Sequence, residues 1–580
     1  MIKTLAKQIK EYKWASIITP IMMVGEVITE TIVPLLMASI VDDGVYAGNI
    51  NHIYKMGGVM LVVAFFGLFF GYMGGRLAAY ASGGFAHNLR EAMYANIQTF
   101  SFNNIDKFST SSLVTRLTTD VSNLQNAYSM MLRMFVRAPS NLIVAMIMAF
   151  YISPRLASIY LIASLFLGIV IMLVMSQAGK HFMAVFDKYD ALNESVQENV
   201  SAIRVVKAYV REAYEKSRFK KASENIYSLF VSAEKITTFI QPIMQGTVYV
   251  CMLLISWFGA HLVVQNELST GSLMSLLTYC MQILTSLMML GMIFVMVTMS
   301  RDSAQRIAEV IEEESDLNNP ENPIYEVKDG SVVFDKVDFA YKGGENLVLE
   351  DISFTVNSGE TIGILGATGS GKSTLVSLIS RLYDIDGGRI LVGGRDVREY
   401  DLKTLRDKVA MVLQKNELFS GTIYDNLRWG DENASDEQCQ KAATIAQAND
   451  FIMAFPDGYN TVISQGGTNV SGGQKQRLCI ARALLKDPKV LILDDSTSAV
   501  DTATDAKMRK AFREDLPNMT KFIIAQRISS IMDADKILLL DDGKLVAFDT
   551  HDNLMENNEM YRSIYESQTG GNGDFDEGGE

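Results

Sequence analysis

Six long apolar stretches fill the first half of this chain, and they restrict its fold more than any other feature of the sequence. The stretches are residues 14–41, 56–75, 138–154, 156–179, 236–266 and 268–300. Each is close to the length that a helix needs to cross the hydrocarbon core of a bilayer, about 20 residues. Buried helices of a protein without a membrane do not account for so many runs in so short a segment. The sequence therefore predicts a helical membrane domain with six spans.

The charge of the chain excludes other classes of protein. Its 66 acidic and 52 basic side chains give a formal net charge of −14, the opposite of a nucleic-acid-binding protein, so no nucleic-acid partner is expected. The four cysteines form no Cys-x-x-Cys pair and are too few for a disulfide scaffold. We expect them to be buried, reduced side chains.

The basic residues of the first half predict the orientation of its loops. Four lysines lie in the first 13 residues, and the long loops 76–137 and 180–235 are rich in lysine and arginine. Because basic loops stay on the cytoplasmic side, we expect the N-terminus and both loops to lie there. Residues 1–13 are expected to form an amphipathic helix on the inner membrane surface. Apolar residues recur every three or four positions in 190–214, so the spans should continue as helices into the cytoplasm.

Two acidic residues, Glu26 and Glu30, lie inside the first apolar stretch. Their spacing places them on one face of a helix, and carboxylates inside a membrane are costly and usually line a cavity. One interpretation makes them contacts for a cationic or polar substrate. The other makes them packing residues that bond to a neighbouring span. The sequence leaves both interpretations open.

The second half of the chain has a different composition. After residues 301–323, whose asparagines and prolines are typical of a linker, short β-branched runs alternate with helical patterns. The segment Gly366-Ala-Thr-Gly-Ser-Gly-Lys372-Ser373-Thr374 matches G-x-x-x-x-G-K-[ST] and lies between a strand-like run, 361–365, and a helical one, 375–382. In that context the loop amides bind phosphates, the lysine reaches the outer phosphates, and the serine binds Mg²⁺.

Two later segments complement this loop. Asp494 ends the apolar run 490–494, where a nucleotide-hydrolysing protein of this kind holds its Mg²⁺. The run Ser471-Gly-Gly-Gln474, followed by an alanine-rich helix, is a second phosphate-binding helix N-terminus about 100 residues after the first. One γ-phosphate does not need two such sites from one chain. We therefore expect the second site to contact a nucleotide that is bound to a partner.

With these motifs the chain resembles the ATP-binding cassette (ABC) family, and in particular its exporters, in which six spans precede one nucleotide-binding domain. The resemblance extends to about residue 568. It implies an α-helical six-span transmembrane domain followed by an α/β P-loop nucleotide-binding domain, with ATP and Mg²⁺ as cofactors. The predicted boundaries are 1–318 for the transmembrane domain, 319–330 for a linker, 331–568 for the nucleotide-binding domain and 569–580 for a disordered acidic tail.

The resemblance also implies roles for single residues. Tyr341 would stack on adenine, Gln414 would join Mg²⁺ and the lytic water to the membrane domain, and Asp501, in loop 498–501, would reach across a dimer. Residues 464–466 resemble a loop that crosses between domains, and 106–117 and 193–205 resemble coupling helices. The predicted nucleotide-binding residues are Tyr341, Gly366, Thr368, Gly369, Ser370, Gly371, Lys372, Ser373, Thr374, Gln414, Ser471, Gly472, Gly473, Gln474 and Asp501, and the Mg²⁺ ligands are Ser373, Gln414 and Asp494.

Two residues depart from the family pattern, and both belong to the γ-phosphate shell. The family has glutamate after the Mg²⁺-binding aspartate and histidine in the switch motif, where this chain has Asp495 and Gln526. Aspartate is one methylene shorter, and a general base must lie within about 2.6–3.2 Å of the proton that it takes. A glutamine amide cannot carry a positive charge or move a proton. We therefore expect this P-loop site to bind ATP and Mg²⁺ and to hydrolyse ATP slowly.

The segment around Ser471 is nearly standard by comparison, with only Val470 in place of the family's leucine. This asymmetry resembles heterodimeric multidrug-type exporters with one degenerate site. The partner would be a second ABC half-transporter with the catalytic glutamate and histidine, and transport would proceed by alternating access. The alternatives are a homodimeric exporter of lipid or peptide, and an ATP-gated channel or regulatory subunit.

The substrate class and the location follow from the resemblance. Hydrophobic or amphiphilic small molecules are the family's default substrates. One membrane domain fused to one nucleotide-binding domain, without a targeting peptide, favours an integral protein of a bacterial inner membrane, with an organelle membrane as the alternative. The lipid bilayer would surround its six spans, and the nucleotide-binding domain would lie in the cytoplasm with the basic loops.

Overall fold

The computed structural model describes residues 1–344, 346–495 and 500–569, with residues 175, 178–184, 186, 187, 190, 191, 194, 294, 295 and 299 described by their backbone alone. Ser498 and the predicted tail from residue 570 onward lie outside these ranges, and Thr569 ends the last helix. The chain forms two compact units. We call Met1–Gln98 with Thr110–Glu313 the helical unit, and Thr99–Ser109 with Glu314–Glu580 the sheet unit.

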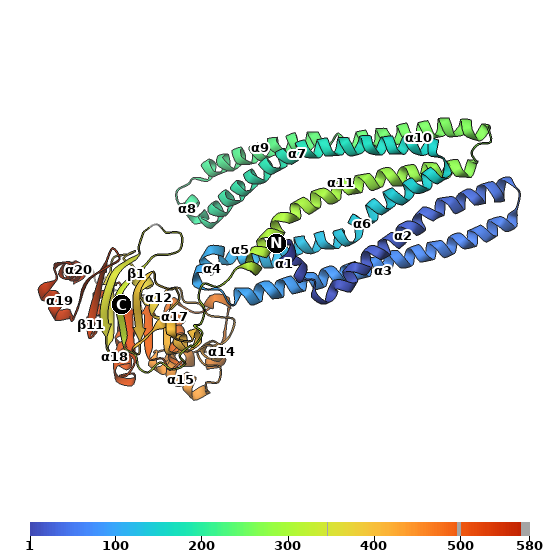
Figure 1. The fold of residues 1–580 in the computed structure, drawn as a ribbon. Helices are drawn as coiled ribbons and strands as arrows, with labels where there is room; N and C mark the ends of the chain where they lie inside the picture. The colour runs from blue at the N-terminus through green and yellow to red at the C-terminus, as the bar shows by residue number, and fades with distance from the viewer. Residues whose placement is uncertain (345, 496–499, 570–580) are drawn as a thin grey trace. The chain divides into compact units, whose positions relative to one another are not determined.

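The helical unit consists of long helices, several of which run alongside one another (Figure 1). Among its described residues, six helical segments are long and apolar enough to cross a membrane, which confirms the predicted spans. The elements are α1 (Ile2–Lys7), η1 (Lys10–Tyr12), α2 (Lys13–Ser39), η2 (Ile40–Tyr46), α3 (Ile50–Ile97), α5 (Thr110–Thr115), η3 (Arg116–Asp120), α6 (Val121–Ile152), α7 (Pro154–Ser201), α8 (Ile203–Ala208), α9 (Glu212–Thr237), α10 (Ile240–Val264) and α11 (Thr270–Glu312).

Most of these helices continue past the apolar stretches that predicted them. α3 and α7 each contain 48 residues and α11 contains 43, whereas about 20 suffice for the hydrocarbon core. The short break between α6 and α7 is at Ser153, and Pro154 opens α7 because its fixed φ and missing N–H suit a first helical position. The expected continuation of the spans as helices is confirmed.

Hydroxyl groups tie the helices together inside the helical unit. Tyr160 of α7 donates to the carbonyl of Leu276 in α11, and Tyr279 of α11 donates to the carbonyl of Thr31 in α2, both at 2.7 Å. Both tyrosines are fully buried among apolar side chains of α6, α7, α10 and α11. A buried hydroxyl needs such a partner, since no water is there to accept its bond.

The sheet unit is built on a six-stranded sheet with the order β12-β11-β3-β10-β9-β6, in which only the β11–β12 pair is antiparallel. A four-stranded sheet has the order β2-β1-β4-β5. The strands are β1 (Val332–Phe339), β2 (Leu349–Val356), β3 (Thr361–Gly366), β4 (Gly387–Val392), β5 (Arg395–Asp396), β6 (Val409–Val412), β7 (Gly421–Thr422), β8 (Val462–Ile463), β9 (Val490–Asp494), β10 (Thr520–Ile524), β11 (Lys536–Asp541) and β12 (Lys544–Asp549).

The central strands β9 and β10 are buried along their whole length, as is usual for parallel strands with both faces covered. Because β3, β10, β9 and β6 are parallel neighbours, the segments that follow them gather at one edge of the sheet. The helices of the unit are α4 (Phe102–Phe108), α12 (Lys372–Ile379), α13 (Leu402–Lys408), α14 (Ile423–Leu427), α15 (Asp436–Ile445), α16 (Asn449–Met453), α17 (Gly472–Leu484), α18 (Thr502–Asp515), α19 (His551–Asn557) and α20 (Glu559–Thr569), with short 3₁₀ turns between some of them.

The two predicted coupling helices differ from the observed short helices. The range 106–117 is broken at Ser109, whose φ of 53° ends α4, so this region holds two short helices, α4 (Phe102–Phe108) and α5 (Thr110–Thr115). The range 193–205 covers the end of α7, and the short helix is α8, Ile203–Ala208. The family resemblance located both regions, but the ends depend on single residues that leave the helical conformation.

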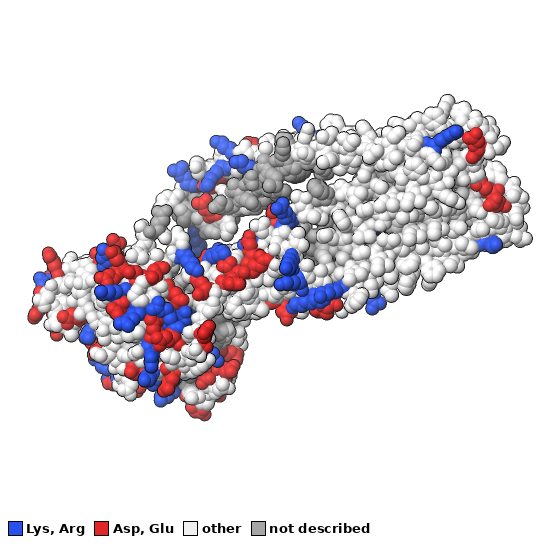
Figure 2. Space-filling model, in the orientation of Figure 1, with Lys and Arg blue, Asp and Glu red and all other residues white. Residues whose placement is uncertain are grey.

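The distribution of charge agrees with this division. Figure 2 shows charged side chains crowded over the sheet unit, while long stretches of the helical unit carry almost none. Aromatic and aliphatic side chains stay exposed there, among them Phe65 (68%), Leu68 (70%) and Trp257 (68%). A bilayer is a solvent in which such exposure costs nothing.

Candidate functional site

The glycine-rich loop joins β3 to α12 at the carboxyl edge of the six-stranded sheet. Gly369 and Gly371 have φ values of 87° and 93°, which only glycine adopts without strain. A Cβ on Gly366 would lie 2.3 Å from the carbonyl oxygen of Leu540. The loop therefore needs its glycines for its path, and it leaves the first amides of α12 facing a common point, the arrangement that binds phosphates.

Lys372 lies across this loop. Its Nζ donates to the carbonyls of Gly366 and Ala367 at 2.9 and 2.7 Å. Burial lowers the pKa of Lys372, and the carboxylates of Asp494 and Asp495 act in the opposite direction. The cation is thus held against two carbonyls of the glycine-rich loop.

Ser373 and Asp494 lie together, as the sequence predicts for a Mg²⁺ site. The serine Oγ donates to the Asp494 Oδ1 at 2.9 Å. Burial raises the pKa of Asp494, so the ionised carboxylate is destabilised until a cation compensates its charge. A hydroxyl and a carboxylate oxygen suit Mg²⁺, which prefers oxygen ligands and usually shares them with phosphates. The residues present fit this ion.

Asp495 and Gln526, the two residues that depart from the family pattern, are in contact. The Gln526 Nε2 donates to the Asp495 Oδ2 at 2.6 Å. They meet because β9 and β10 are parallel neighbours, with Asp494 opposite Ile524. Asp495 is 8% exposed with φ of 49°, and its carbonyl accepts a bond from Gln476 at 3.4 Å.

The backbone of Gln526 is also held in place. Its carbonyl accepts a bond from the Gln568 side chain at 3.0 Å, and the Oε1 of the same side chain accepts the amide of Ile528 at 2.8 Å. The last helix, α20, thereby supports the loop that carries Gln526. No sequence motif indicated this role of Gln568.

Tyr341 lies close to the start of α12. Its hydroxyl is 2.9 Å from the Thr374 Oγ1, and its ring meets those of Phe339 and Tyr383 edge to face, with centroids 5.0 and 5.2 Å away. The tyrosine is 36% exposed, so part of its ring remains open. This placement beside the glycine-rich loop agrees with the predicted adenine platform.

The other predicted nucleotide residues lie on exposed loops and helix ends. Gln414 is exposed after β6, the strand beside β9. Ser471 caps α17 in a reciprocal capping box with Gln474, and Asp501 caps α18 by accepting the amide of Thr504 at 2.9 Å. Ser471 and Asp501 are both exposed.

Glu26 and Glu30 are paired with Arg137 in the helical unit. The sequence predicts a loop over 76–137, which includes this arginine. Arg137 of α6 approaches Glu26 at 3.4 Å and Glu30 at 3.1 Å. The three line a groove of about 660 Å³ with α3 residues that include Gly67 and Gly71. Charges inside a membrane usually pair with one another. That rule could have identified Arg137, which directly precedes the apolar stretch 138–154, as a partner of the two glutamates.

Gly71 gives the carboxylate of Glu26 its space. A Cβ at Gly71 would lie 3.2 Å from the Glu26 Oε1, and one at Gly67 would lie 3.1 Å from the Thr29 Oγ1. α2 and α3 therefore pack closely on this side, with polar side chains against glycine. The packing interpretation of the two glutamates agrees with these contacts, and the groove leaves room for the substrate interpretation.

Comparisons with known proteins connect both units to one family. Residues 16–287 match the ABC transporter transmembrane region, and residues 349–498 match the ABC transporter family. The chain is 37% identical over 565 residues to YfiB of Bacillus subtilis (strain 168), an uncharacterized ABC transporter ATP-binding protein, covering 97% of this chain and 98% of that one.

Two further proteins extend the comparison. The chain is 35% identical over 421 residues to YheI of the same organism, a probable multidrug resistance ABC transporter ATP-binding/permease protein, covering 73% and 72% of the two chains. Its fold is similar to that of a bacterial Atm1-family ABC exporter with ATP bound. That similarity has a TM-score of 0.81 at 24% sequence identity and covers 96% of this chain and 99% of the other.

Proposed function

The chain belongs to the ABC transporter family, and from that premise we propose that it is one half of a heterodimeric exporter. Its own P-loop site would bind ATP and Mg²⁺ but hydrolyse ATP slowly. The observation that carries this proposal is the 2.6 Å hydrogen bond from Gln526 to Asp495. The residue at the position of the base and the residue at the switch position are hydrogen-bonded to each other, so part of the bonding capacity of each is already used.

The chemistry of the two side chains supports slow hydrolysis. A general base contributes roughly 10²- to 10⁴-fold to such a reaction when it lies within hydrogen-bond reach of the attacking water. Asp495 is short, buried and already accepts a bond from an amide. Gln526 can donate a hydrogen bond to a phosphate oxygen, but it has no proton to transfer and no positive charge.

The residues that bind the triphosphate support retained ATP binding. Lys372 and the loop amides would hold the outer phosphates, while Ser373 and Asp494 would hold Mg²⁺. Bound Mg²⁺ supplies positive charge to the β- and γ-phosphates. Asp494 and Ser373 orient each other across 2.9 Å, so this half of the site needs little rearrangement.

The exposed caps support a second, composite site. Ser471 and Gly472 open the 13-residue helix α17 at the surface of the sheet unit, and Asp501 opens α18. A helix N-terminus attracts phosphate. We propose that these residues complete the P-loop site of a second half-transporter, which supplies the catalytic glutamate and histidine.

Transport would proceed by alternating access across a bacterial inner membrane, with the sheet unit in the cytoplasm. ATP can shift the conformational equilibrium only through its preference for the closed pair of nucleotide domains. A nucleotide that stays unhydrolysed on this chain would bias that equilibrium throughout the cycle, and hydrolysis at the partner's site would reset it.

The substrates would be hydrophobic or amphiphilic compounds. The description of YheI as a probable multidrug resistance transporter supports this class. In the groove at Glu26, Glu30 and Arg137, two acidic groups face one basic group, which favours a cationic substrate. A transport assay with a cationic and a neutral dye tests this part: Glu26→Gln with Glu30→Gln should reduce only the cationic dye's transport.

The ATPase activity of the purified chain, alone and with its partner half-transporter, tests the proposal. We expect little activity alone and full activity in the complex. Asp495→Ala should leave most of the complex's activity, whereas loss of the partner's glutamate should abolish it. Strong activity of the chain alone, abolished by Asp495→Asn, would show a working homodimer. ATP-dependent single-channel current in place of dye accumulation would show a channel.

A further inference from the structure

One segment of the sheet unit comes from a distant part of the sequence. Residues Thr99–Ser109, which contain α4, belong to the unit although α3 and α5, on either side, belong to the helical unit. α4 begins at a reciprocal capping box between Ser101 and Asn104, and the Asn104 side chain donates to the carbonyl of Glu314 at 3.2 Å. α4 is therefore held as a defined element of the sheet unit.

A chain of ring contacts connects α4 to Tyr341. The rings of Tyr341 and Tyr383 meet at 89° with centroids 5.2 Å apart, and the Tyr383 hydroxyl donates to the Asp106 Oδ2 at 3.0 Å. Phe102 of α4 also meets the Tyr383 ring edge to face, at 5.9 Å. Tyr383 is 9% exposed, and burial together with Asp106 raises the pKa of its hydroxyl, so the hydroxyl stays a donor at neutral pH.

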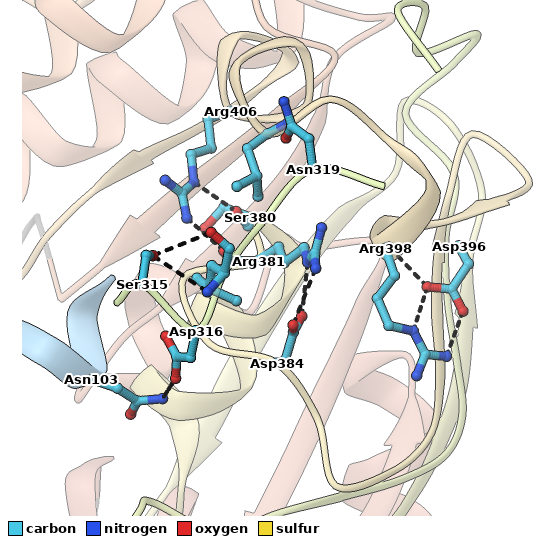
Figure 3. A network of polar contacts seen from close by, with 12 residues as sticks. Asn103, Ser315, Asp316, Asn319, Ser380, Arg381, Asp384, Asp396, Arg398 and Arg406 are labelled. Atoms are coloured by element: carbon cyan, nitrogen blue, oxygen red, sulfur yellow. Dashed lines mark hydrogen bonds and ion pairs between the residues drawn. The ribbon is translucent and has the colours of Figure 1, made fainter. Parts of the chain in front are cut away.

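A second connection starts at the next residue of the same loop. The Lys342 Nζ lies 2.7 Å from the Asp316 Oδ2. The Asn103 Nδ2 of α4 donates to the same oxygen at 2.8 Å, a contact that Figure 3 shows. Burial acts to raise the pKa of Asp316, but hydrogen bonds from Lys342, Ser101 and Asn103 bring it down to about 2. The carboxylate is ionised at every physiological pH and holds the loop and α4 together.

We propose that Tyr383 and Asp316 are positioning residues that couple the adenine platform to α4. The inference rests on the proposed function, since it takes Tyr341 as the platform for the base. A base stacked on Tyr341 restricts the ring, and the perpendicular Tyr383 ring and its bond to Asp106 transmit that restriction to α4. Coupling between two sites is reciprocal. If binding of the base restricts α4, then restricting or releasing α4 must change the affinity for the base to the same extent.

The comparison of two ligands isolates the base from the phosphates. ATP and inorganic tripolyphosphate both use the glycine-rich loop, but only ATP has a base. In the full complex, Tyr383→Phe and Asp316→Asn should each weaken ATP binding about two- to tenfold, the range for loss of one hydrogen bond, and leave tripolyphosphate binding unchanged. Asp106→Asn should act like Tyr383→Phe, and the two together should add little.

Matched controls exclude a general loss of stability. Tyr400 also has a buried hydroxyl, which donates to the carbonyl of Val392 at 2.7 Å, and Asp396 is paired with Arg398 at 2.7 Å (Figure 3). Tyr400→Phe and Asp396→Asn remove similar groups, whose partners are Val392 and Arg398 rather than residues of α4 or of the 341–342 loop. Both controls should bind ATP like the unchanged protein.

Hydrogen exchange of the α4 amides provides the readout at the other end of the connection. ATP should slow this exchange in the unchanged complex and in Tyr400→Phe, and it should have less effect in Tyr383→Phe. The inference is wrong if ATP leaves the exchange of α4 unchanged, or if Tyr383→Phe weakens ATP and tripolyphosphate binding equally. These results leave the hydrolysis assay of Asp495 unaffected, so the two proposals fail separately.

Discussion

At the scale of single residues, the residues proposed to bind the nucleotide differ from those whose positions correspond to hydrolysis. Lys372, Ser373 and Asp494 are the residues that we propose to hold a triphosphate and Mg²⁺. Asp495 and Gln526 occupy the positions that, in our proposal, would act on the γ-phosphate, and a hydrogen bond joins them. The proposed loss of hydrolysis therefore rests on two differences from the family: Asp495 is one methylene shorter than glutamate, and Gln526 lacks the titratable proton of histidine.

Restoring both family residues should restore hydrolysis. We expect Asp495→Glu with Gln526→His to raise the ATPase rate of the chain's own P-loop site at least tenfold, because the base gains reach and the switch residue gains a transferable proton. The rate is measured in a complex whose partner carries glutamine in place of its catalytic glutamate. An unchanged rate in the double variant would contradict the explanation by these two residues.

Asp494 provides a prediction on stability and pH. Burial raises its pKa above the value in the unfolded chain, so the folded state binds more protons between the two pKa values, and stability falls as pH rises through that window. Asp494→Asn should keep or raise the nucleotide-free Tm at pH 7 and remove the additional stabilisation by ATP and Mg²⁺. Thermal unfolding from pH 4 to 8, with and without nucleotide, measures both effects. A lower Tm of the variant without nucleotide would contradict the assignment.

At the scale of elements, close packing between helices explains which residues meet. Glycines on α3 allow α2 to approach, and Arg137 of α6 joins the same groove. In the sheet unit the parallel order of β3, β10, β9 and β6 places four functional segments at one edge. In both units, the arrangement of the backbone determines which side chains meet at the site.

The ion pairs between α2 and α6 should stabilise the helical unit. Arg137→Met leaves two carboxylates without their cation, and we expect a loss of about 1–3 kcal/mol, less than for a fully buried pair because the Glu30 side chain is 41% exposed. Adding Glu26→Gln and Glu30→Gln should recover most of that loss. Unfolding in detergent micelles measures the stability of each variant. Equal stability of Arg137→Met and the unchanged protein would show that the pairs only orient the groove.

At the scale of the whole molecule, we propose that the glycine-rich loop and the caps of α17 and α18 serve different nucleotide sites. In this proposal the glycine-rich loop binds a nucleotide for this chain, while the caps of α17 and α18 are exposed on the sheet unit. In a heterodimer each composite site then combines one subunit's loop with the other's cap. The fold similarity to an Atm1-family exporter concerns the chain as a whole.

Ser471 should therefore affect the partner's hydrolysis rather than this chain's binding. Ser471→Ala removes the hydroxyl that caps α17, and we expect the steady-state ATPase activity of the complex to fall about tenfold or more, with ATP still bound at Lys372. Photo-crosslinking with an azido-ATP distinguishes the two sites. Ser435→Ala, which removes a similar capping box from α15, is the control. Loss of ATP from this chain's own P-loop would contradict the composite arrangement.

The sequence alone determined the features that depend on local pattern. Apolar length predicts spans because a bilayer has a set thickness, and the P-loop is readable because its glycines, lysine and serine act within nine consecutive residues. The departures at Asp495 and Gln526 were also visible, since a motif states which residue type its chemistry needs. The six spans and the order of the two folds were therefore predictable.

Only the tertiary structure decided which distant residues meet. It brought Gln526 to Asp495, Arg137 to Glu26 and Glu30, and Tyr383 to both Tyr341 and Asp106. These partners are separated by 31 to 277 positions, as Gln526 to Asp495 and Tyr383 to Asp106 show. The physical reason is that strand order and helix packing bring such residues together, and periodicity or motif spacing carries no record of either.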